Sequence, residues 1–491
     1  MTRTFLKRNM YALAALMAAN AACGQWSFTL DTTFRTQIVQ QNVNAIHVLP
    51  GTGIYLSGRV RFPGDMSDRP LSLIDETGVQ VASFPYSWGG GKMVPWTNKL
   101  YVQNGNLIRR MNLDGSIDLS FASQSGGSGS APHISLPTNG DYHVFPDGGV
   151  LLGGSYMLSD TMNGFVGWYR LVWLTNTGYL DTTRTHRTAN GPIWAFTELP
   201  DGKFICSCSC TQYEGQPVSR VFRVQTDGAL DTTFQTGVNW GNIFAYHPLP
   251  DGRVYIGGRY KRATAPNDTL FLARFLPDGS LDPTFTPPSI TMGGLAADYG
   301  PLVTWLQPWP GGHLIASGEF GSVNQMSRES IFMVDSTGAL TAAFDNFHVG
   351  IYQGQFGANA SINWITSVST DTLYICGAYI GLNDGTTNDP QQRFVSRLLV
   401  SELTTGVARK APRVVSIRPN PAAGTCMVEL EELPLNAMLI VRDALGRERL
   451  RQLVRSHSTT LELHTLSDGI YILELLTPHK RVATQRLVVQ H

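Results

Sequence analysis

A short phrase recurs seven times along this 491-residue chain and limits the folds open to it. The clearest copies have an Asp-Gly turn, an apolar strand-forming run and then a pair of small residues, as in Pro146 to Gly154 and Pro250 to Gly258, and looser copies start near Pro50, Trp96, Pro200, Pro310 and Thr370. The second small residue falls at Gly58, Asn104, Gly154, Cys208, Gly258, Gly318 and Gly377. A long repeat of this kind indicates an array of similar units, and a period of roughly 50 residues with several short strands suits propeller blades.

A second phrase, Leu-Asp-x-x-Phe, accompanies the units, as in Leu230 to Phe234 and Leu281 to Phe285. Its first copy, Leu30 to Phe34, precedes the first unit, and the last unit ends near Thr405 without a copy. We therefore expect the N-terminal strand to complete the last blade and close the ring, which removes exposed sheet edges. The predicted fold is all-β, a seven-bladed β-propeller over residues 25–405. Six or eight blades remain open because the second unit is degenerate.

The repeat resembles the delta-60 repeat family of bacterial secreted proteins. The matching residues are Leu249-Pro250-Asp251-Gly252-Arg253, Gly257-Gly258, Ala273-Arg274-Phe275 and Asp278-Gly279-Ser280-Leu281-Asp282. The resemblance covers about residues 26–405. It implies a propeller-like fold and carries no catalytic residues onto this chain.

The N-terminus predicts an export signal over residues 1–24. Arg3, Lys7 and Arg8 precede an apolar stretch from Tyr11 to Ala22, which is too short to span a bilayer. We expect cleavage between Gly24 and Gln25. An uncleaved anchor, or a lipoprotein at Cys23, is the alternative. No later stretch reaches the roughly 18 apolar residues of a membrane helix, so we expect no transmembrane segment in the mature chain.

After a polar linker over residues 406–416, the repeat gives way to five or more short strands over residues 417–491, which predict a small Ig-like β-sandwich. This segment resembles the C-terminal sorting domain of the type IX secretion system of Bacteroidetes. The motif residues are Pro419, Asn420, Pro421, Asp443, Gly446, Arg447, Asp468, Gly469 and Tyr471. The resemblance implies a partner in the type IX machinery, passage across the outer membrane, and secretion or surface attachment. An Ig-like module without a transport role is the alternative.

The composition and the absence of catalytic motifs favour a binding protein over an enzyme. Only 15% of residues are charged and the net charge is zero, which argues against a nucleic-acid partner. The chain has no G-x-S-x-G, H-E-x-x-H or phosphate-loop motif. The recurring Asp147, Asp201 and Asp251 are expected to form turns. We expect no cofactor and no metal.

Two segments contain residue types that bind metals. Cys206, Cys208 and Cys210 are predicted to alternate along one strand, where residues two apart have poor disulfide geometry. Buried small side chains are favoured there over a soft-metal site. The oxygen-rich stretch 383–389 suggests calcium, but a solvated loop is favoured.

Aromatic residues give the sharpest hint of a ligand. Trp194, Phe244 and Trp364 are predicted to occupy the same place in their units, with Trp305 one step away. If this place opens toward the channel mouth, they would form a stacking platform for a glycan or a protein segment; packing between blades is favoured over this, because aromatic residues dominate cores.

The chain is therefore predicted to be a secreted or cell-surface, non-enzymatic binding or adhesion protein. The alternative is a secreted polysaccharide hydrolase or lyase with acids lining the propeller channel. Its nearest candidates are Glu198, Glu319 and Asp345.

Overall fold

The computed structural model describes residues 25–85, 88–105, 107–122, 132–138, 140–293, 300–354, 357–403, 414–430, 437–443, 446–454, 456–477 and 480–491. These residues form β-strands and one short 3-10 turn, η1 (Pro310–Gly312), so the all-β prediction is confirmed. The chain divides into two compact units, the first ending at Leu403 and the second beginning at Thr404. The predicted signal peptide with Gly24, and residues 404–413 of the linker region, lie outside the described residues.

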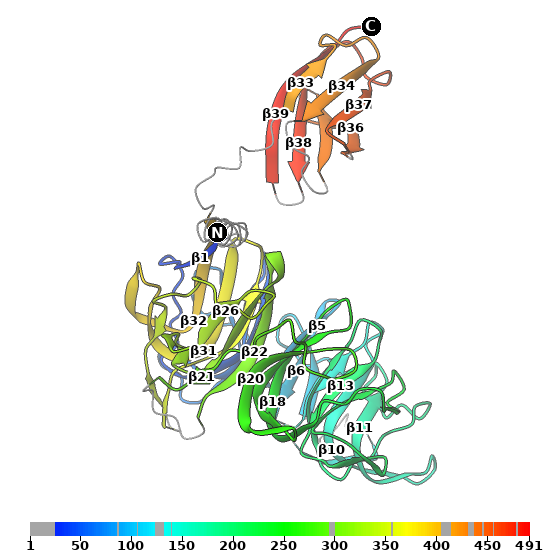
Figure 1. Cartoon of the computed structure of the whole chain (residues 1–491), viewed down its shortest axis with the longest axis vertical. Helices are drawn as coiled ribbons and strands as arrows, with labels where there is room; N and C mark the ends of the chain where they lie inside the picture. Colours follow the sequence, from blue (N-terminus) through cyan, green and yellow to red (C-terminus); the bar gives the residue numbers. More distant parts are fainter. Residues whose placement is uncertain are drawn as a thin grey trace, which may run out of the picture. The chain divides into compact units, whose positions relative to one another are not determined.

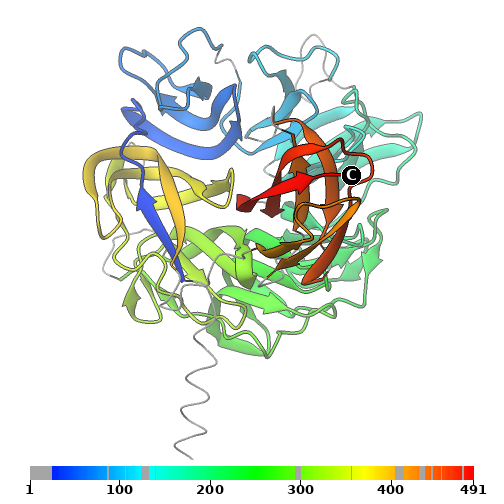
Figure 2. The ribbon, with the colours of Figure 1, turned by 90° about the horizontal axis from the view of Figure 1, so that it is seen from above.

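The first unit consists of antiparallel sheets arranged around a central space (Figures 1 and 2). Each repeat contributes one sheet, because a tight turn reverses the chain between two strand-forming runs. In chain order the repeat sheets are β2 (Gln40–Leu49), β3 (Gly53–Arg61), β4 (Arg69–Ile74); β5 (Met93–Trp96), β6 (Lys99–Asn104), β7 (Leu107–Asn112); β8 (Ile134–Thr138), β9 (Tyr142–Val144), β10 (Val150–Asp160), β11 (Phe165–Leu174); β12 (Ile193–Glu198), β13 (Phe204–Cys208), β16 (Val221–Val224), β17 (Leu230–Asp231); β18 (Val238–Pro248), β19 (Val254–Arg262), β20 (Ala265–Phe275); β22 (Leu302–Trp309), β23 (His313–Glu319), β26 (Ile331–Val334); and β30 (Ser361–Ser367), β31 (Thr372–Asn383), β32 (Asn388–Leu403) with β1 (Gln25–Leu30) and β27 (His348–Val349).

Short additional strands decorate this unit. They are β14 (Gln212–Tyr213) with β15 (Gln216–Pro217); β21 (Ile290–Thr291) with β24 (Ser322–Val323) and β25 (Met326–Ser327); and β28 (Tyr352–Gly354) with β29 (Gly357–Asn359).

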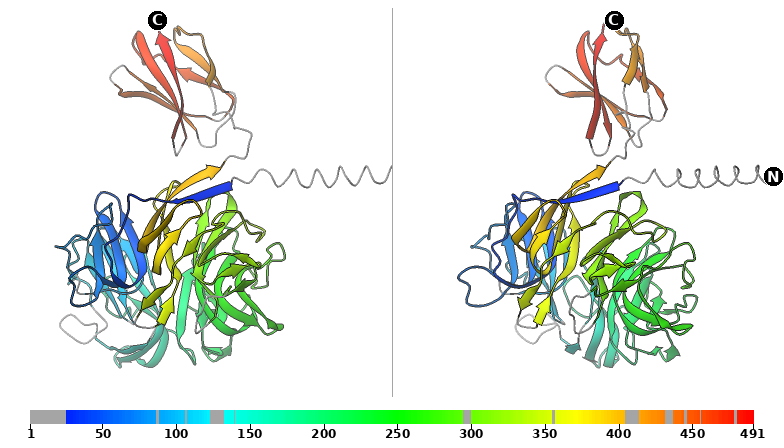
Figure 3. Two further views of the ribbon diagram at one scale, coloured as in Figure 1. Left: turned by 90° about the vertical axis from the view of Figure 1, so that its left-hand side faces the viewer. Right: turned by 60° about the vertical axis from the view of Figure 1, so that its left-hand side comes forward.

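The N-terminal strand completes the last repeat sheet, as the sequence predicts. β1 pairs antiparallel with β32 from Gln25 opposite Leu403 to Leu30 opposite Leu398, and the two strands lie side by side in Figure 3. Just beyond β1, Phe34 joins a core that the first and last repeat sheets share. The start of the chain is thereby tied to its last repeat.

A buried ion pair explains the Leu-Asp-x-x-Phe phrase. Arg274 Nε lies 2.7 Å from Asp282 Oδ2, and Arg274 Nη2 donates to the Thr284 hydroxyl at 2.8 Å. Arg274 Nη1 donates to the carbonyl oxygen of Ser336, in the turn of the next repeat, at 2.6 Å. The guanidinium carbon lies 5.2 Å from the centre of the Phe285 ring. We call this set the Arg–Asp staple, because it joins one repeat to the next.

The staple recurs in three other repeats. The equivalent pairs are Arg110–Asp118 at 2.6 Å, Arg223–Asp231 at 2.8 Å and Arg397–Asp31 at 2.8 Å. Within each of the three internal staples the arginine stands eight residues before the aspartate. Burial alone would raise the pKa of Asp282, but hydrogen bonds from Thr284 and the cations Arg253 and Arg274 outweigh it and hold that pKa well below its usual range.

The sixth repeat lacks the staple, and it lacks both the arginine and the aspartate. In the sixth repeat Thr341 donates its backbone N–H to the Met333 carbonyl at 3.0 Å, as Asp282 does to Arg274 at 2.9 Å. Met333 and Thr341 therefore occupy the places of Arg274 and Asp282. An apolar and a neutral residue avoid leaving one buried charge alone.

This replacement suggests a test in the fifth repeat. Arg274→Met removes one of the two cations beside the buried Asp282 and leaves only Arg253. We expect this single variant to lower the free energy of unfolding by about 3 kcal/mol. The double variant Arg274→Met/Asp282→Thr, which copies Met333 and Thr341, should be more stable than the single variant. Urea unfolding followed by tryptophan fluorescence measures both. A double variant less stable than Arg274→Met would contradict a coupled pair.

The second unit has its own core between two antiparallel sheets. Ile417, Val428, Leu439, Leu461 and Leu473 all belong to that core. The sheets are β33 (Val414–Arg418), β34 (Thr425–Leu430), β37 (Ser458–Glu462); and β36 (Glu448–Leu453), β35 (Met438–Arg442), β38 (Gly469–Thr477), β39 (Lys480–Val489). The seven strands agree with the prediction of five or more, and β36 is largely exposed and rich in charge, so it lacks an apolar run.

Candidate functional site: a cavity among the strand bulges

The first strand of several repeat sheets carries the same irregularity. In β18, Ile243 pairs with Gly258 and Ala245 with Gly257, so Phe244 has no residue opposite it. The residues skipped in this way are Asn44, Trp194, Phe244, Thr304 and Asn363. Such a β-bulge breaks the usual alternation of side chains and re-aims the extra one.

In the first, fifth, sixth and seventh repeats, a glycine in the small pair makes room for the bulge. A Cβ on Gly258 would lie 2.3 Å from the carbonyl oxygen of Asn242, much closer than atoms approach. The same clash would arise at Gly58, Gly318 and Gly377. A Cβ on Gly257 would lie 2.9 Å from Val303 of the next sheet. The pair is thus small because one member faces the bulged strand and the other faces the neighbouring sheet.

The bulges surround a cavity of about 580 Å³. Its volume falls in the range of pockets that hold small ligands. The lining residues come from the second to the seventh repeat: Lys92, Gln103, Gly140, Asp141, Trp194, Ala195, Asn242, Ile243, Phe244, Thr304, Trp305, Asn363 and Trp364.

All four aromatic residues singled out in the sequence line this cavity. Trp194 is 37% exposed and Phe244 47% exposed. Trp305 and Trp364 stack on each other, with ring centres 3.6 Å apart. Trp364 follows the bulge residue Asn363, so it shares the place of Trp305 and not that of Trp194. The predicted register of Trp364 was wrong by one residue, because counting back from the turn does not account for turn length.

The charged lining residues neutralise each other. Lys92 Nζ lies 2.8 Å from Asp141 Oδ1 and also donates to the Tyr142 carbonyl at 2.8 Å. Asp141 accepts the backbone N–H groups of Tyr142 at 2.7 Å and Phe196 at 3.3 Å. Within the described lining, Asp141 is the only carboxylate, and three donors engage its oxygens. This arrangement fixes the position of the Asp141 carboxylate.

The other predicted acids lie away from the cavity lining. Glu198 Oε2 is 3.3 Å from His143 Nε2; burial raises the pKa of Glu198, and burial together with the Lys92 charge lowers the pKa of His143 to about 4. Asp345 forms an ion pair with Arg328, and Glu319 ends β23. The structure therefore does not bring these acids together at one site.

The acids of the Asp-Gly turns act as predicted. Asp147, Asp201 and Asp251 each accept the backbone N–H of the residue two positions later, at 2.8, 3.2 and 3.1 Å. These bonds shape the turn, as expected of aspartate at this position.

The stretch 383–389 is exposed at Gly385, Thr386 and Asn388, as predicted for a solvated loop, but its two acids are buried. Asp384 and Asp389 are both 8% exposed. Asp384 accepts the backbone N–H groups of Leu30 and Thr386, and Asp389 forms an ion pair with Arg35. The acids fasten the N-terminal segment to the last sheet. Across the described residues, no group of three His, Cys, Asp or Glu side chains is placed to hold a metal.

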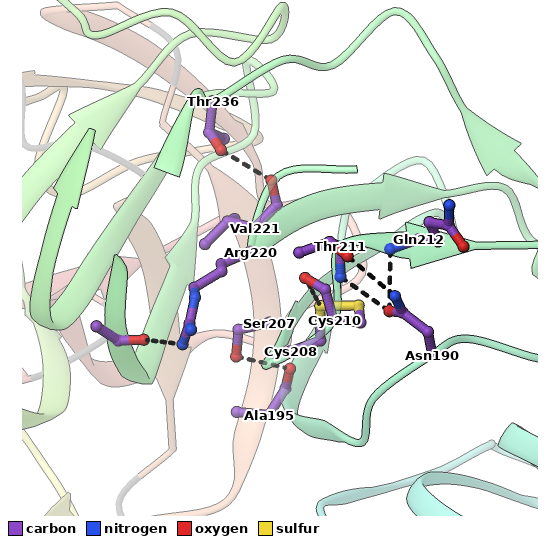
Figure 4. Close-up of a disulfide and its surroundings, with 11 residues drawn as sticks. Asn190, Ala195, Ser207, Cys208, Cys210, Thr211, Gln212, Arg220, Val221 and Thr236 are labelled. Atoms are coloured by element: carbon purple, nitrogen blue, oxygen red, sulfur yellow. Dashed lines mark hydrogen bonds between the residues drawn. A yellow bond between two sulfur atoms is a disulfide. The ribbon is translucent and has the colours of Figure 1, made fainter. Parts of the chain in front are cut away.

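The cysteine prediction was wrong in one respect: Cys208 and Cys210 form a disulfide (Figure 4). β13 ends at Cys208, so Cys210 lies beyond the strand. Their Cα atoms are 5.1 Å apart, closer than the roughly 6.6 Å between alternate residues of a strand. Cys208 pairs with Ile193 and so stands where glycine stands opposite Ile243. Cys206 and Cys376 are buried free thiols, as expected.

Removing this disulfide should have a modest effect, because it closes a very short loop. We expect reductant to lower the free energy of unfolding of the protein by about 1–2 kcal/mol. The variant Cys208→Ser/Cys210→Ser should start lower by a similar amount and show no response to reductant. Urea unfolding with and without reductant measures both. A response that persists in the variant would show that other cysteines are responsible.

In the second unit, the predicted sorting residues shape turns and hold the last strand. Asn420 donates to the Arg486 carbonyl at 2.9 Å and accepts the Val488 N–H at 2.8 Å, both in β39. Asp468 accepts the backbone N–H of His491 at 2.9 Å. The remaining motif residues lie in neighbouring turns: Asp443, Gly446 and Arg447 close one turn, Pro419 and Pro421 flank Asn420, and Gly469 starts the strand that holds the buried Tyr471.

Two family models match parts of the chain, one within the first unit and one over most of the second. A model described as a β-propeller domain of unknown function, DUF5122, matches residues 199–234 and 249–285. A model of the secretion system C-terminal sorting domain matches residues 416–490. No curated protein matches the chain.

Solved structures with some similarity are remote. PorZ of Porphyromonas gingivalis, described as a surface component of the type IX secretion system, is 11% identical, with 92% of this chain and 75% of PorZ covered and a TM-score of 0.29. The WD40 domain of Neurospora crassa Pan2 is 7% identical, with coverages of 75% and 89% and a TM-score of 0.33. A Bacteroides caccae protein of unknown function is 10% identical, with coverages of 65% and 92% and a TM-score of 0.29.

Among the described residues, no helix is long and apolar enough to cross a membrane.

Proposed function

We propose that this β-propeller protein, which its type IX sorting domain directs to the cell surface or the medium, is a non-enzymatic binding or adhesion protein. Its type IX sorting domain is handled by the type IX machinery. The observation that carries the proposal is the cavity among the bulges, with exposed aromatic side chains and a neutralised ion pair. Concave sites with aromatic walls and a few placed polar groups are typical ligand sites.

The proposal includes a ring of seven blades, spanning residues 25–405. Two observations support a closed ring. The first and last repeat sheets share a core that includes Ile54 and Tyr374, and β1 from the start of the chain pairs with β32. The second unit, residues 417–491, is proposed to be an Ig-like sandwich, and the leader to end at Gly24.

The cavity favours binding over the alternative of polysaccharide cleavage. Glycoside hydrolysis ordinarily needs two carboxyl groups flanking the scissile bond. The described lining offers Asp141 alone, and its oxygens are already engaged by Lys92, Tyr142 and Phe196. Binding needs only the apolar surface and hydrogen-bonding groups that the cavity presents.

A variant that fills the cavity tests this role. Ala195 occupies in its sheet the place that Trp305 and Trp364 occupy in theirs, so the strand geometry accepts an indole there. On an array of immobilised glycans and peptides, the purified protein should bind at least one class of ligand. Ala195→Trp should weaken that binding by at least 10-fold, whatever the class.

The matched control is Trp168→Ala, which changes an exposed tryptophan outside the cavity lining and should bind like the parent protein. Silence of the parent protein across the array, or full binding by Ala195→Trp, would refute a binding role for the cavity.

A further inference from the structure

We infer that the cavity binds neutral carbohydrate and receives the terminal one or two sugar units of a glycan. The inference rests on the proposed binding function and names its ligand class. Four features of the cavity support it: the paired charges of the lining, its aromatic surface, its amide side chains and its limited volume.

The charge of the lining favours a neutral ligand. Lys92 and Asp141 are the only charged side chains in the described lining, and they pair at 2.8 Å. A phosphate, sulfate or carboxylate group is recognised by cations that are free to form charge-assisted hydrogen bonds. Here the single cation is held by Asp141 and the Tyr142 carbonyl. A charged ligand would have to break that pair.

The exposed aromatic rings offer what a sugar ring needs. Trp194 and Phe244 are the bulge residues of adjacent repeats, and they are 37% and 47% exposed. The Trp305–Trp364 stack forms a second aromatic wall. One face of a pyranose ring carries mainly C–H groups, so burying that face against an indole or phenyl ring removes apolar area from water.

Amide side chains are available for the sugar hydroxyls. Asn242 and Asn363 line the cavity, and neither amide has a hydrogen-bond partner among the described residues. An amide both donates and accepts, as a hydroxyl does, so the two groups are complementary in either orientation. Thr304 adds a hydroxyl, whose nearest acceptor, the Ser317 carbonyl, lies at 3.4 Å.

The backbone around the cavity is poorly suited to a peptide. One common way to capture an extended peptide is to pair it with a regular strand edge. Here the bulges at Trp194, Phe244, Thr304 and Asn363 interrupt that regularity, and the Gln103 amide already donates to the Gly140 and Gly105 carbonyls. A carbohydrate requires no such edge.

The volume of the cavity favours a chain end. Side chains from the second to the seventh repeat line it, and about 580 Å³ holds a small group rather than a long polymer segment. An internal segment of a long polymer needs an exit on two sides. A terminal unit needs one opening only.

The test uses the purified protein and calorimetric titration with named probes. They are neutral hexaoses of glucose, mannose and xylose, a neutral N-glycan released from glycoprotein, oligogalacturonate as an anionic sugar, and a peptide library. We expect binding to at least one neutral probe, with little change between low and high salt, because no ion pair with the ligand is formed. The hexaose and N-glycan arms separate polysaccharide from glycoprotein as the source.

Variants link the binding to the cavity. Trp194→Ala and Phe244→Ala should each weaken the neutral ligand about 30-fold, as expected of aromatic hot spots. Asn242→Ala should cost about 5-fold. Both aromatic side chains are exposed, so these variants should fold, which circular dichroism verifies. Trp168→Ala should bind like the parent protein.

The outcomes separate the carbohydrate inference from the binding function on which it rests. Binding of peptides alone, or of oligogalacturonate with strong salt dependence, would overturn the carbohydrate inference and leave a binding function intact. No binding to any probe would overturn both. A disaccharide matching the chain terminus should compete with its hexaose. If only the long chain binds, the cavity does not read a chain end.

Discussion

The buried Arg–Asp staple is the interaction on which the rest of the first unit depends. In each copy the arginine holds the aspartate of its own repeat and donates to a carbonyl in the turn of the next, as Arg223 does to Pro277 at 2.7 Å. Arg397 makes the same bond to Glu76 at 2.8 Å while holding Asp31, so the contact that joins neighbours also joins the end of the repeat array to its start. Bonds to charged groups, once buried, are costly to break singly, and this favours one arrangement of repeats over others.

Because the staples hold neighbouring sheets together, the first strand of a sheet tolerates a β-bulge. The bulge at Phe244 displaces one side chain from the sheet, and Gly258 gives the opposite carbonyl the space it requires. Repeated around the unit, the bulges place Trp194, Phe244, Thr304 and Asn363 at one cavity. A site built on strands rather than on long loops is already organised before a ligand arrives, which reduces the ordering cost of binding.

Much of this could be predicted from the sequence, because turns and strands are local. The roles of Asp147, Asp201 and Asp251 and the pairing of β1 with the last repeat followed from the repeat. The four aromatic residues line one cavity, with Trp364 one position from its predicted place, and their role in binding stays a prediction. The count of seven blades stays a prediction.

Features that depend on contacts between distant segments were missed. The arginine of the staple was not recognised, although its constant spacing of eight residues before the aspartate was a usable signal. Asp384 was expected in solvent because its partner, the Leu30 amide, is 354 positions away. The Cys208–Cys210 disulfide depends on where β13 ends, and strand ends are set by tertiary context.

The most direct test of the account is native-state hydrogen exchange on the variant Asp31→Asn, compared with the parent protein. Loss of this carboxylate leaves Arg397 without its partner at the point where the first and last repeats meet. If the staple closes the ring, amide exchange should accelerate in β1 and β32 and also in the first repeat around Gly78, which packs against the Arg35 and Thr36 backbone. Faster exchange confined to residues 25–34 would contradict the account.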